Sequence, residues 1–149
     1  AALHPAKPYL YVIGELNNTT NVLEIKDDFT FDLVQTVENV PQEYRSDASG
    51  AAIRITQDGR FVYSSSRFHD IITVFEINEE NGQISEIQKI GTVGQIPRDF
   101  ILDSTEKFVL VPHQDSDYIS IFSRNSATGE LKFLNNETKA PECVCIASA

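Results

Sequence analysis

Three polar side chains that could act together chemically recur at one position of a repeating pattern. Glu15, Arg67 and Gln114 each end an alternating apolar stretch, and they are 52 and 47 residues apart. A carboxylate can orient or deprotonate a water molecule, whereas a guanidinium pairs with a carboxylate or phosphate and stabilises developing oxyanion charge. With the amide of Gln114 as a further donor, the three residue types suit an anionic ester or lactone.

The segments that carry these residues align with one another without a gap. They read YLYVIGELNNTTNVLEI from Tyr9, FVYSSSRFHDIITVFEI from Phe61 and FVLVPHQDSDYISIFSR from Phe108. Period-2 alternation with many β-branched residues predicts strands, and turn sequences such as QDG precede each copy. We therefore expect an all-β fold of units with four short antiparallel strands, in which AIRIT and DFILD are innermost strands.

The length of the repeat distinguishes two all-β architectures. Four antiparallel strands in every ~45 to 50 residues is the period of a β-propeller blade, whereas a sandwich of the same hairpins would not explain so regular a repeat. We predict a single, partial propeller domain over residues 1–149, with blade units of about 1–49, 50–96 and 97–149. Because equivalent positions of a propeller lie on one ring, the three polar residues should converge on one rim of the central channel.

Two further residues are candidates for binding a substrate at this rim. His69 follows Arg67 closely and could donate a hydrogen bond to a substrate or to a loop carbonyl group. Arg98 lies in the segment IPRDF, at the start of an innermost strand. It could face the channel, or it could form an ion pair with Asp99 or with a neighbouring blade.

Other polar residues of the repeat are expected to be structural. Asp70 aligns with Asn18 and Asp117, so an Asx residue recurs at this position and should cap a turn with its side chain. His113 should point away from the site, because alternate residues of a strand face opposite sides. His4, in a His-Pro turn, is expected to be exposed to solvent.

Composition limits the partners of the chain. Its 149 residues are 41% hydrophobic and carry a formal net charge of -10, which is typical of a globular domain and argues against a nucleic-acid or anionic-membrane surface. No apolar run approaches the ~20 residues of a membrane span, and AALHPAKPY lacks the features of a signal peptide, so we expect a cytoplasmic protein. Cys143 and Cys145 should be reduced, and with three scattered histidines they give no zinc-type spacing. Neither a metal nor another cofactor is expected.

The sequence resembles the lactonase family of seven-bladed propellers, which contains bacterial 6-phosphogluconolactonases and the fungal carboxy-cis,cis-muconate lactonizing enzyme. The likeness lies in HPAKPYLYVIGEL, QDGRFVYSSSRFHDIITVF, IPRDFILD and PECVCIA. It implies that the active-site glutamate of the family corresponds to Glu15 and one of its arginines to Arg67, while its catalytic histidine and another arginine would precede residue 1. Two positions depart from the family pattern: Arg54 replaces a frequent histidine, and Phe68 replaces a glycine and should narrow the channel mouth.

The resemblance and the repeat together give one main functional hypothesis. The chain would be the C-terminal part of a lactonase-type propeller enzyme that hydrolyses or forms a sugar-acid or dicarboxylic-acid lactone without a metal. Its catalytic residues would be Glu15 and Arg67, and its substrate-binding residues Gln114, His69 and Arg98. Because propellers need ~4 to 8 blades, further blades should come from the same polypeptide or another copy. A non-catalytic propeller that binds a ligand or protein on its rim, and a self-associating half, are the alternatives.

Overall fold

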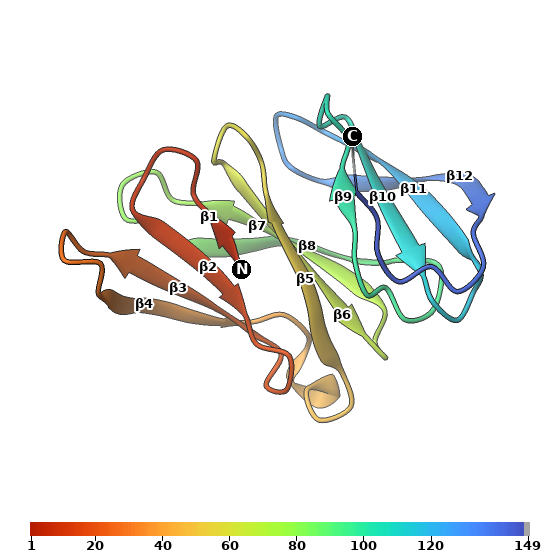
Figure 1. Ribbon diagram of the computed structural model, residues 1–149, viewed down its shortest axis with the longest axis horizontal. Coiled ribbons are helices and arrows are strands. Elements are labelled where there is room, and N and C mark those ends of the chain that lie inside the picture. Colours follow the sequence, from red (N-terminus) through yellow and green to blue (C-terminus); the bar gives the residue numbers. More distant parts are fainter. Residues whose placement is uncertain (148–149) are drawn as a thin grey trace.

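The chain folds into three four-stranded antiparallel sheets, and the computed structural model describes residues 1–147 (Figure 1). The first sheet contains β1 (Ala2–Leu3), β2 (Tyr9–Ile13), β3 (Thr19–Ile25) and β4 (Phe31–Glu38). The second contains β5 (Ser49–Ile55), β6 (Phe61–Arg67), β7 (Ile71–Ile77) and β8 (Ile84–Gly91). The third contains β9 (Ile101–Leu102), β10 (Phe108–His113), β11 (Tyr118–Arg124) and β12 (Leu131–Lys139). Each sheet pairs its strands in chain order, which confirms the all-β prediction and excludes the sandwich.

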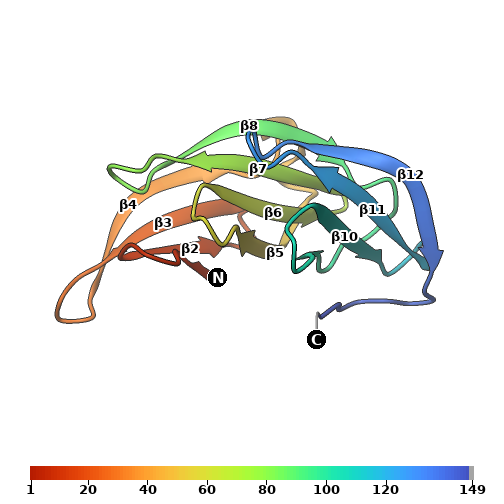
Figure 2. The same ribbon diagram turned by 90° about the horizontal axis from the view of Figure 1, so that it is seen from above.

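The three sheets stand side by side along an arc, as blades of a propeller do. In Figure 2 the fourth strands β4, β8 and β12 follow the convex side, and β5 lies on the concave side. The segment AIRIT begins within β5, and DFILD contains β9, so both predicted innermost segments take the first position of their sheets. Within residues 1–147 the one helical element is η1 (Gln42–Tyr44), a 3-10 turn in the connection between the first two sheets.

Apolar side chains fill the two seams between neighbouring sheets. On β6 the odd and even residues point to opposite faces, so Val62 packs against the first sheet and Phe61 and Tyr63 against the third. The first seam holds Tyr11, Val22, Ile53, Val62, Phe75, Ile77 and Ile84. The second holds Ala52, Phe61, Tyr63, Ile72, Val74, Phe100, Val109, Val111, Phe122 and Leu131. All seven residues of β6 are buried because the second sheet is covered on both faces.

A repeated aromatic and glycine contact sets the spacing of the sheets. The Tyr11 hydroxyl group donates to the carbonyl oxygen of Gly82 at 3.0 Å, and the Tyr63 hydroxyl group donates to that of Gly129 at 2.7 Å. Both glycines have positive φ, 69° and 76°, which favours glycine in these turns. A Cβ atom at Gly82 would lie 2.5 Å from the ring of Tyr9, so glycine also allows the turn to approach the preceding sheet.

Candidate active site

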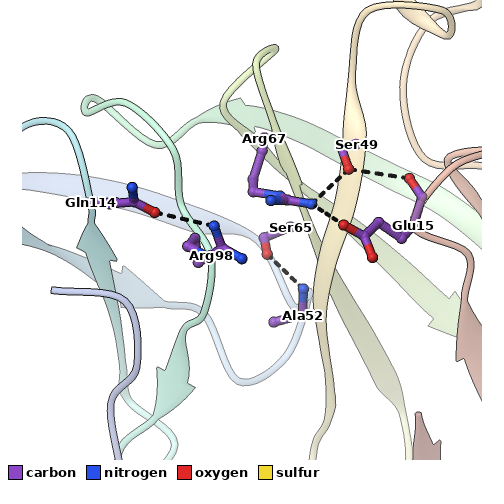
Figure 3. Close-up of polar contacts among 7 residues, drawn as sticks. All are labelled: Glu15, Ser49, Ala52, Ser65, Arg67, Arg98 and Gln114. Atoms are coloured by element: carbon purple, nitrogen blue, oxygen red, sulfur yellow. Dashed lines mark hydrogen bonds and ion pairs between the residues drawn. The ribbon is translucent and has the colours of Figure 1, made fainter. Parts of the chain in front are cut away.

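An ion pair joins the first two sheets at one rim. Glu15 follows β2 and Arg67 ends β6, and Nη2 of Arg67 donates to Oε1 of Glu15 at 2.5 Å (Figure 3). The side chain of Arg67 is 10% exposed, whereas that of Glu15 is 65% exposed. The repeat correctly placed these two residues at one rim. The guanidinium group is embedded in the protein, and the carboxylate remains open to solvent.

Backbone contacts between the two sheets hold Glu15 in place. Its carbonyl oxygen accepts hydrogen bonds from the Gly50 amide at 3.0 Å and from Oγ of Ser49 at 3.3 Å. A Cβ atom at Gly50 would lie 2.5 Å from the carbonyl oxygen of Gly14, so only glycine allows this approach of the chains. Ser49 also lies directly opposite Arg67 in the pairing of β5 with β6, which places its hydroxyl group beside the ion pair.

A cavity of about 340 Å³ opens beside the pair. It is lined by Ala1, Ile13, Glu15, Gly50, Ala51, Arg67 and Arg98. The backbone of β5 bulges at this point, because the pairing register shifts between Gly50 and Ile53 and the Ala52 amide bonds to Oγ of Ser65 at 3.0 Å instead. Bulges of this kind occur often next to active sites. The cavity brings one carboxylate and two guanidinium groups together, and its volume suits a small ligand.

Arg98 lines the cavity, and Gln114, which does not line it, accepts a hydrogen bond from Arg98. The exposed side chain of Arg98 donates from Nη1 to Oε1 of Gln114 at 3.2 Å (Figure 3). Gln114 itself lines a separate surface depression with Asp115, Asp117, Glu142 and Val144. The predicted ring position of Gln114 therefore places it one side chain away from the cavity that Glu15 and Arg67 line.

His69 lies apart from this group. Its ring stacks on that of Tyr44, with centroids 3.9 Å apart and an interplanar angle of 19°. Phe68 and Asp70 on either side of it have left-handed backbones, with φ of 68° and 50°, and this turn directs the imidazole toward the connection between the sheets. The structure thus does not bring the predicted donor His69 to the cavity that Arg67 lines. Phe68, expected to narrow the mouth, is exposed and does not line the cavity either.

Asp70 caps its turn, as the sequence predicted. Its Oδ1 accepts from the Phe68 amide at 3.1 Å and from the Ile96 amide at 2.9 Å. The aligned residues Asn18 and Asp117 have positive φ values like that of Asp70. The recurring Asx residue therefore serves the left-handed turn conformation.

The two remaining histidines are both buried. The prediction of an exposed His4 was wrong: its Nδ1 accepts from the amides of Ala6 and Lys7 at 3.1 and 3.0 Å, and burial together with nearby Lys7 lowers its pKa. His113 is structural, as expected, and its Nε2 lies 2.9 Å from Oγ of Ser120. Burial lowers the pKa of His113 to about 4, so this imidazole is neutral at neutral pH.

Arg54 and Asp99 form a second ion pair that sequence reasoning missed. Nη2 of Arg54 donates to Oδ1 of Asp99 at 2.5 Å, across the seam between the second and third sheets. The ion-pair alternative for Arg98 is therefore wrong as regards Asp99, because another arginine occupies that carboxylate. Cys143 and Cys145 are not joined by a disulfide bond, and Cys143 is half-buried whereas Cys145 is exposed. Within residues 1–147 no cluster of three His, Cys, Asp or Glu side chains could hold a metal ion. No helix in that range is long and apolar enough to cross a membrane.

Comparison with known proteins identifies relatives over nearly the whole chain. Residues 1–148 match the family described as Lactonase, 7-bladed beta-propeller. A 6-phosphogluconolactonase of Bacillus subtilis is 37% identical over 97% of this chain, which covers 42% of that protein. A crystal structure from Lactobacillus plantarum superposes with a TM-score of 0.92 at 34% identity, over 97% of this chain and 42% of that one. The periplasmic gluconolactonase of Pseudomonas aeruginosa shares the fold, with a TM-score of 0.86 at 23% identity over 91% of this chain and 38% of that one. The chain thus spans about two-fifths of the length of these relatives.

Proposed function

Because this chain belongs to the lactonase family of seven-bladed β-propellers, we propose that it supplies part of the active site of a lactone hydrolase. The observation that carries the proposal is the Glu15 and Arg67 pair, whose open carboxylate and embedded guanidinium group face one cavity. This pairing provides a base and a cation within reach of one small molecule. The same resemblance had assigned these two residues to the site.

The reaction requires a base, an oxyanion partner and a group that binds the substrate. Glu15 takes a proton from a water molecule, and the water oxygen attacks the lactone carbonyl carbon. The negative charge that develops on the carbonyl oxygen is stabilised by Arg67. When the ring C–O bond breaks, the departing alkoxide takes up the proton that Glu15 received from the water, and the product is the open hydroxy acid. Arg98, held by Gln114, is suited to bind a phosphate or carboxylate of the substrate.

We propose a phosphorylated sugar-acid lactone as the substrate and hydrolysis as the direction. The relative from Bacillus subtilis is a 6-phosphogluconolactonase, and two guanidinium groups beside one carboxylate leave the cavity with a positive balance. The 65% exposure of Glu15 gives water direct access to the base. Cyclisation of a dicarboxylic acid would use the same groups in reverse, but nothing at this cavity favours the exclusion of water.

Further blades are part of the proposal, from the same polypeptide or from another copy. Phe61 is 1% exposed because the third sheet covers it, whereas Phe108, at the equivalent repeat position of that third sheet, is 40% exposed. Leu3, Phe31 and Leu33 are exposed on the first sheet, at the other end of the arc. Apolar blade faces of this kind require a neighbour in a repeat protein. A cytoplasmic location stays a prediction.

The test is a direct assay of the full-length protein. Hydrolysis should be measured with the δ-lactones of 6-phosphogluconate and of gluconate and with a carboxymuconolactone. We expect the highest kcat/KM for the phosphorylated lactone. Turnover of the carboxymuconolactone alone would overturn the substrate class. Binding of 6-phosphogluconate without hydrolysis of any lactone would instead favour the non-catalytic binding module.

A further inference from the structure

The hydroxyl group of Ser49 forms hydrogen bonds with both residues of the ion pair. Its Oγ accepts a hydrogen bond from Nη2 of Arg67 at 2.7 Å and donates one to the carbonyl oxygen of Glu15 at 3.3 Å (Figure 3). One hydroxyl group therefore links the embedded guanidinium group to the backbone of the residue that carries the carboxylate. No motif in the sequence singles out this serine.

These bonds determine how the guanidinium group of Arg67 is oriented. The two protons of Nη2 go to two acceptors, Oε1 of Glu15 at 2.5 Å and Oγ of Ser49 at 2.7 Å. The buried Nε has no hydrogen-bond partner among the described residues, and Nη1 makes no hydrogen bond within residues 1–147. Among the hydrogen bonds within residues 1–147, only those of Nη2 orient the group, and removal of one acceptor would leave a single hydrogen bond about which it can turn.

The segment before Ser49 contacts both turns that carry the pair. We call residues 40–49, which connect the first and second sheets, the strap. Within it, Tyr44 stacks on His69, two residues beyond Arg67, and Arg45 donates from Nε to the Asn17 carbonyl oxygen at 3.2 Å, two residues beyond Glu15. The strap ends at Ser49, whose hydroxyl group forms hydrogen bonds with Arg67 and Glu15. It also contains the extra residues that make the first repeat 52 rather than 47 residues long.

We propose that Ser49 is a positioning residue, which the strap holds in place and which orients Arg67 toward Glu15 for the reaction. The inference rests on the proposed lactone hydrolysis for its kinetic consequence and on the hydrogen bonds alone for its structural one. Arg67 acts on charge that develops in the transition state, whereas Arg98 binds the substrate. Loss of Ser49 should thus lower kcat and leave KM almost unchanged.

The first test compares three variants of the full-length protein. Ser49→Ala should lower kcat about tenfold, as expected for a lost hydrogen bond to a charged group, while KM changes less than about threefold. Ser49→Thr keeps the hydroxyl group and should retain kcat within about threefold. Thr56→Val is the matched control, because Thr56 is buried and follows the end of β5 opposite to Ser49, where its hydroxyl group donates to Oδ1 of Asp58 at 2.6 Å. It should affect stability and leave kcat unchanged.

A second comparison separates positioning from general destabilisation. In an Arg67→Ala background, Ser49→Ala should cause no further loss of kcat, because the group that it positions is gone. An unchanged kcat in Ser49→Ala, an equal loss of kcat in Thr56→Val, or a full additional loss in the Arg67→Ala background would each overturn the proposal.

The structural arm does not depend on activity. A crystal structure of the Ser49→Ala variant should show the guanidinium group of Arg67 turned from its position, with the bond to Oε1 of Glu15 lengthened or lost. If the wild-type protein hydrolyses no lactone but this displacement occurs, the proposed function fails and the positioning role stands. If the pair keeps its geometry, the positioning role fails whatever the activity.

Discussion

In the part of the chain that the structure describes, two arginine and carboxylate pairs join neighbouring sheets, and they differ in which partner is buried. Across the first seam Arg67 is 10% exposed and Glu15 is 65% exposed. Across the second seam the order is reversed, with Arg54 38% exposed and Asp99 13% exposed. Both pairs have a nitrogen to oxygen distance of 2.5 Å, so the ion pair itself does not distinguish them.

The difference lies in the acceptor capacity that remains. Both oxygens of Asp99 are in use, because Oδ1 accepts from Arg54 and Oδ2 accepts from the Ile146 amide at 3.2 Å. Glu15 uses only Oε1 among the described residues and lines the cavity with its carboxylate. A satisfied carboxylate between sheets supports the fold, whereas an exposed one with a free oxygen beside a cavity can act on a water molecule.

The largest effect is expected at the first pair. In the full-length protein Glu15→Gln and Arg67→Ala should each lower lactone turnover by roughly a hundredfold or more, as for a lost base or oxyanion donor. Asp99→Asn, at the second pair, should leave turnover within about threefold. Steady-state kinetics with the phosphorylated lactone would measure all three.

A control comes from the turn that carries Arg67. Asp70→Ala should lower stability by about 1 kcal/mol, as for other lost caps, and leave turnover unchanged. Wild-type turnover in both Glu15→Gln and Arg67→Ala would contradict a catalytic role of the first pair. A hundredfold loss of turnover in Asp99→Asn would contradict a purely structural role of the second.

The second seam should also respond to acid through His113. The first seam has Ser66 at the equivalent repeat position. Because the folded-state pKa of His113 is about 4 and the ordinary value is 6.5, the unfolded chain gains a proton as the pH falls below 6.5 and the folded chain does not. The free energy of unfolding should therefore decrease between pH 6.5 and pH 4, by on the order of 3 kcal/mol in total.

Chemical denaturation at several pH values would measure this loss. The unfolding free energy of a His113→Gln variant should decrease less over this pH range. Part of the decrease should remain, because the pKa of His4 is also lowered. Equal pH dependence in the wild type and the variant would show that the buried imidazole does not carry the effect.

A smaller effect than that of acid is expected at the tyrosines that repeat in the two seams. The Tyr63 hydroxyl group donates to Gly129 and also accepts a hydrogen bond from Nε of Arg124 at 2.9 Å, whereas that of Tyr11 makes, among residues 1–147, only the hydrogen bond to Gly82. Tyr63→Phe should thus cost about 2 kcal/mol of unfolding free energy and Tyr11→Phe about 1 kcal/mol. Thermal denaturation of the two variants in parallel would rank them, and a larger loss for Tyr11→Phe would reverse the assignment.

Much of the fold was predictable because strand positions repeat. The alignment placed Glu15 and Arg67 at one rim, since equivalent residues of successive blades differ only by the rotation from blade to blade. The capping role of Asp70 was also readable, because an Asx residue recurs where the backbone is left-handed.

The rest depends on features that do not repeat. His69 was misjudged because its direction is set by two left-handed neighbours and by Tyr44 from the strap. Ser49 could not be found because its contact with Arg67 follows from the pairing of β5 with β6. Asp99 forms its ion pair with Arg54 of the neighbouring sheet and not with Arg98, and the spacing of the residues in the sequence does not distinguish these two partners.

The contact between Gly82 and Tyr9 has a consequence at a distance. It lies at the start of β2, and Glu15 follows the other end of that strand, about 20 Å away at ~3.3 Å per residue. The first two sheets are therefore in contact at two separate places, through Gly82 and Tyr9 at one end of β2 and through the ion pair at the other. A methyl group at Gly82 would push the turn away from Tyr9 and so change the angle between the two sheets. In a propeller the angles between successive blades must add up to a full turn. The absence of a side chain at Gly82, far from the cavity, therefore contributes to the geometry that ring closure requires.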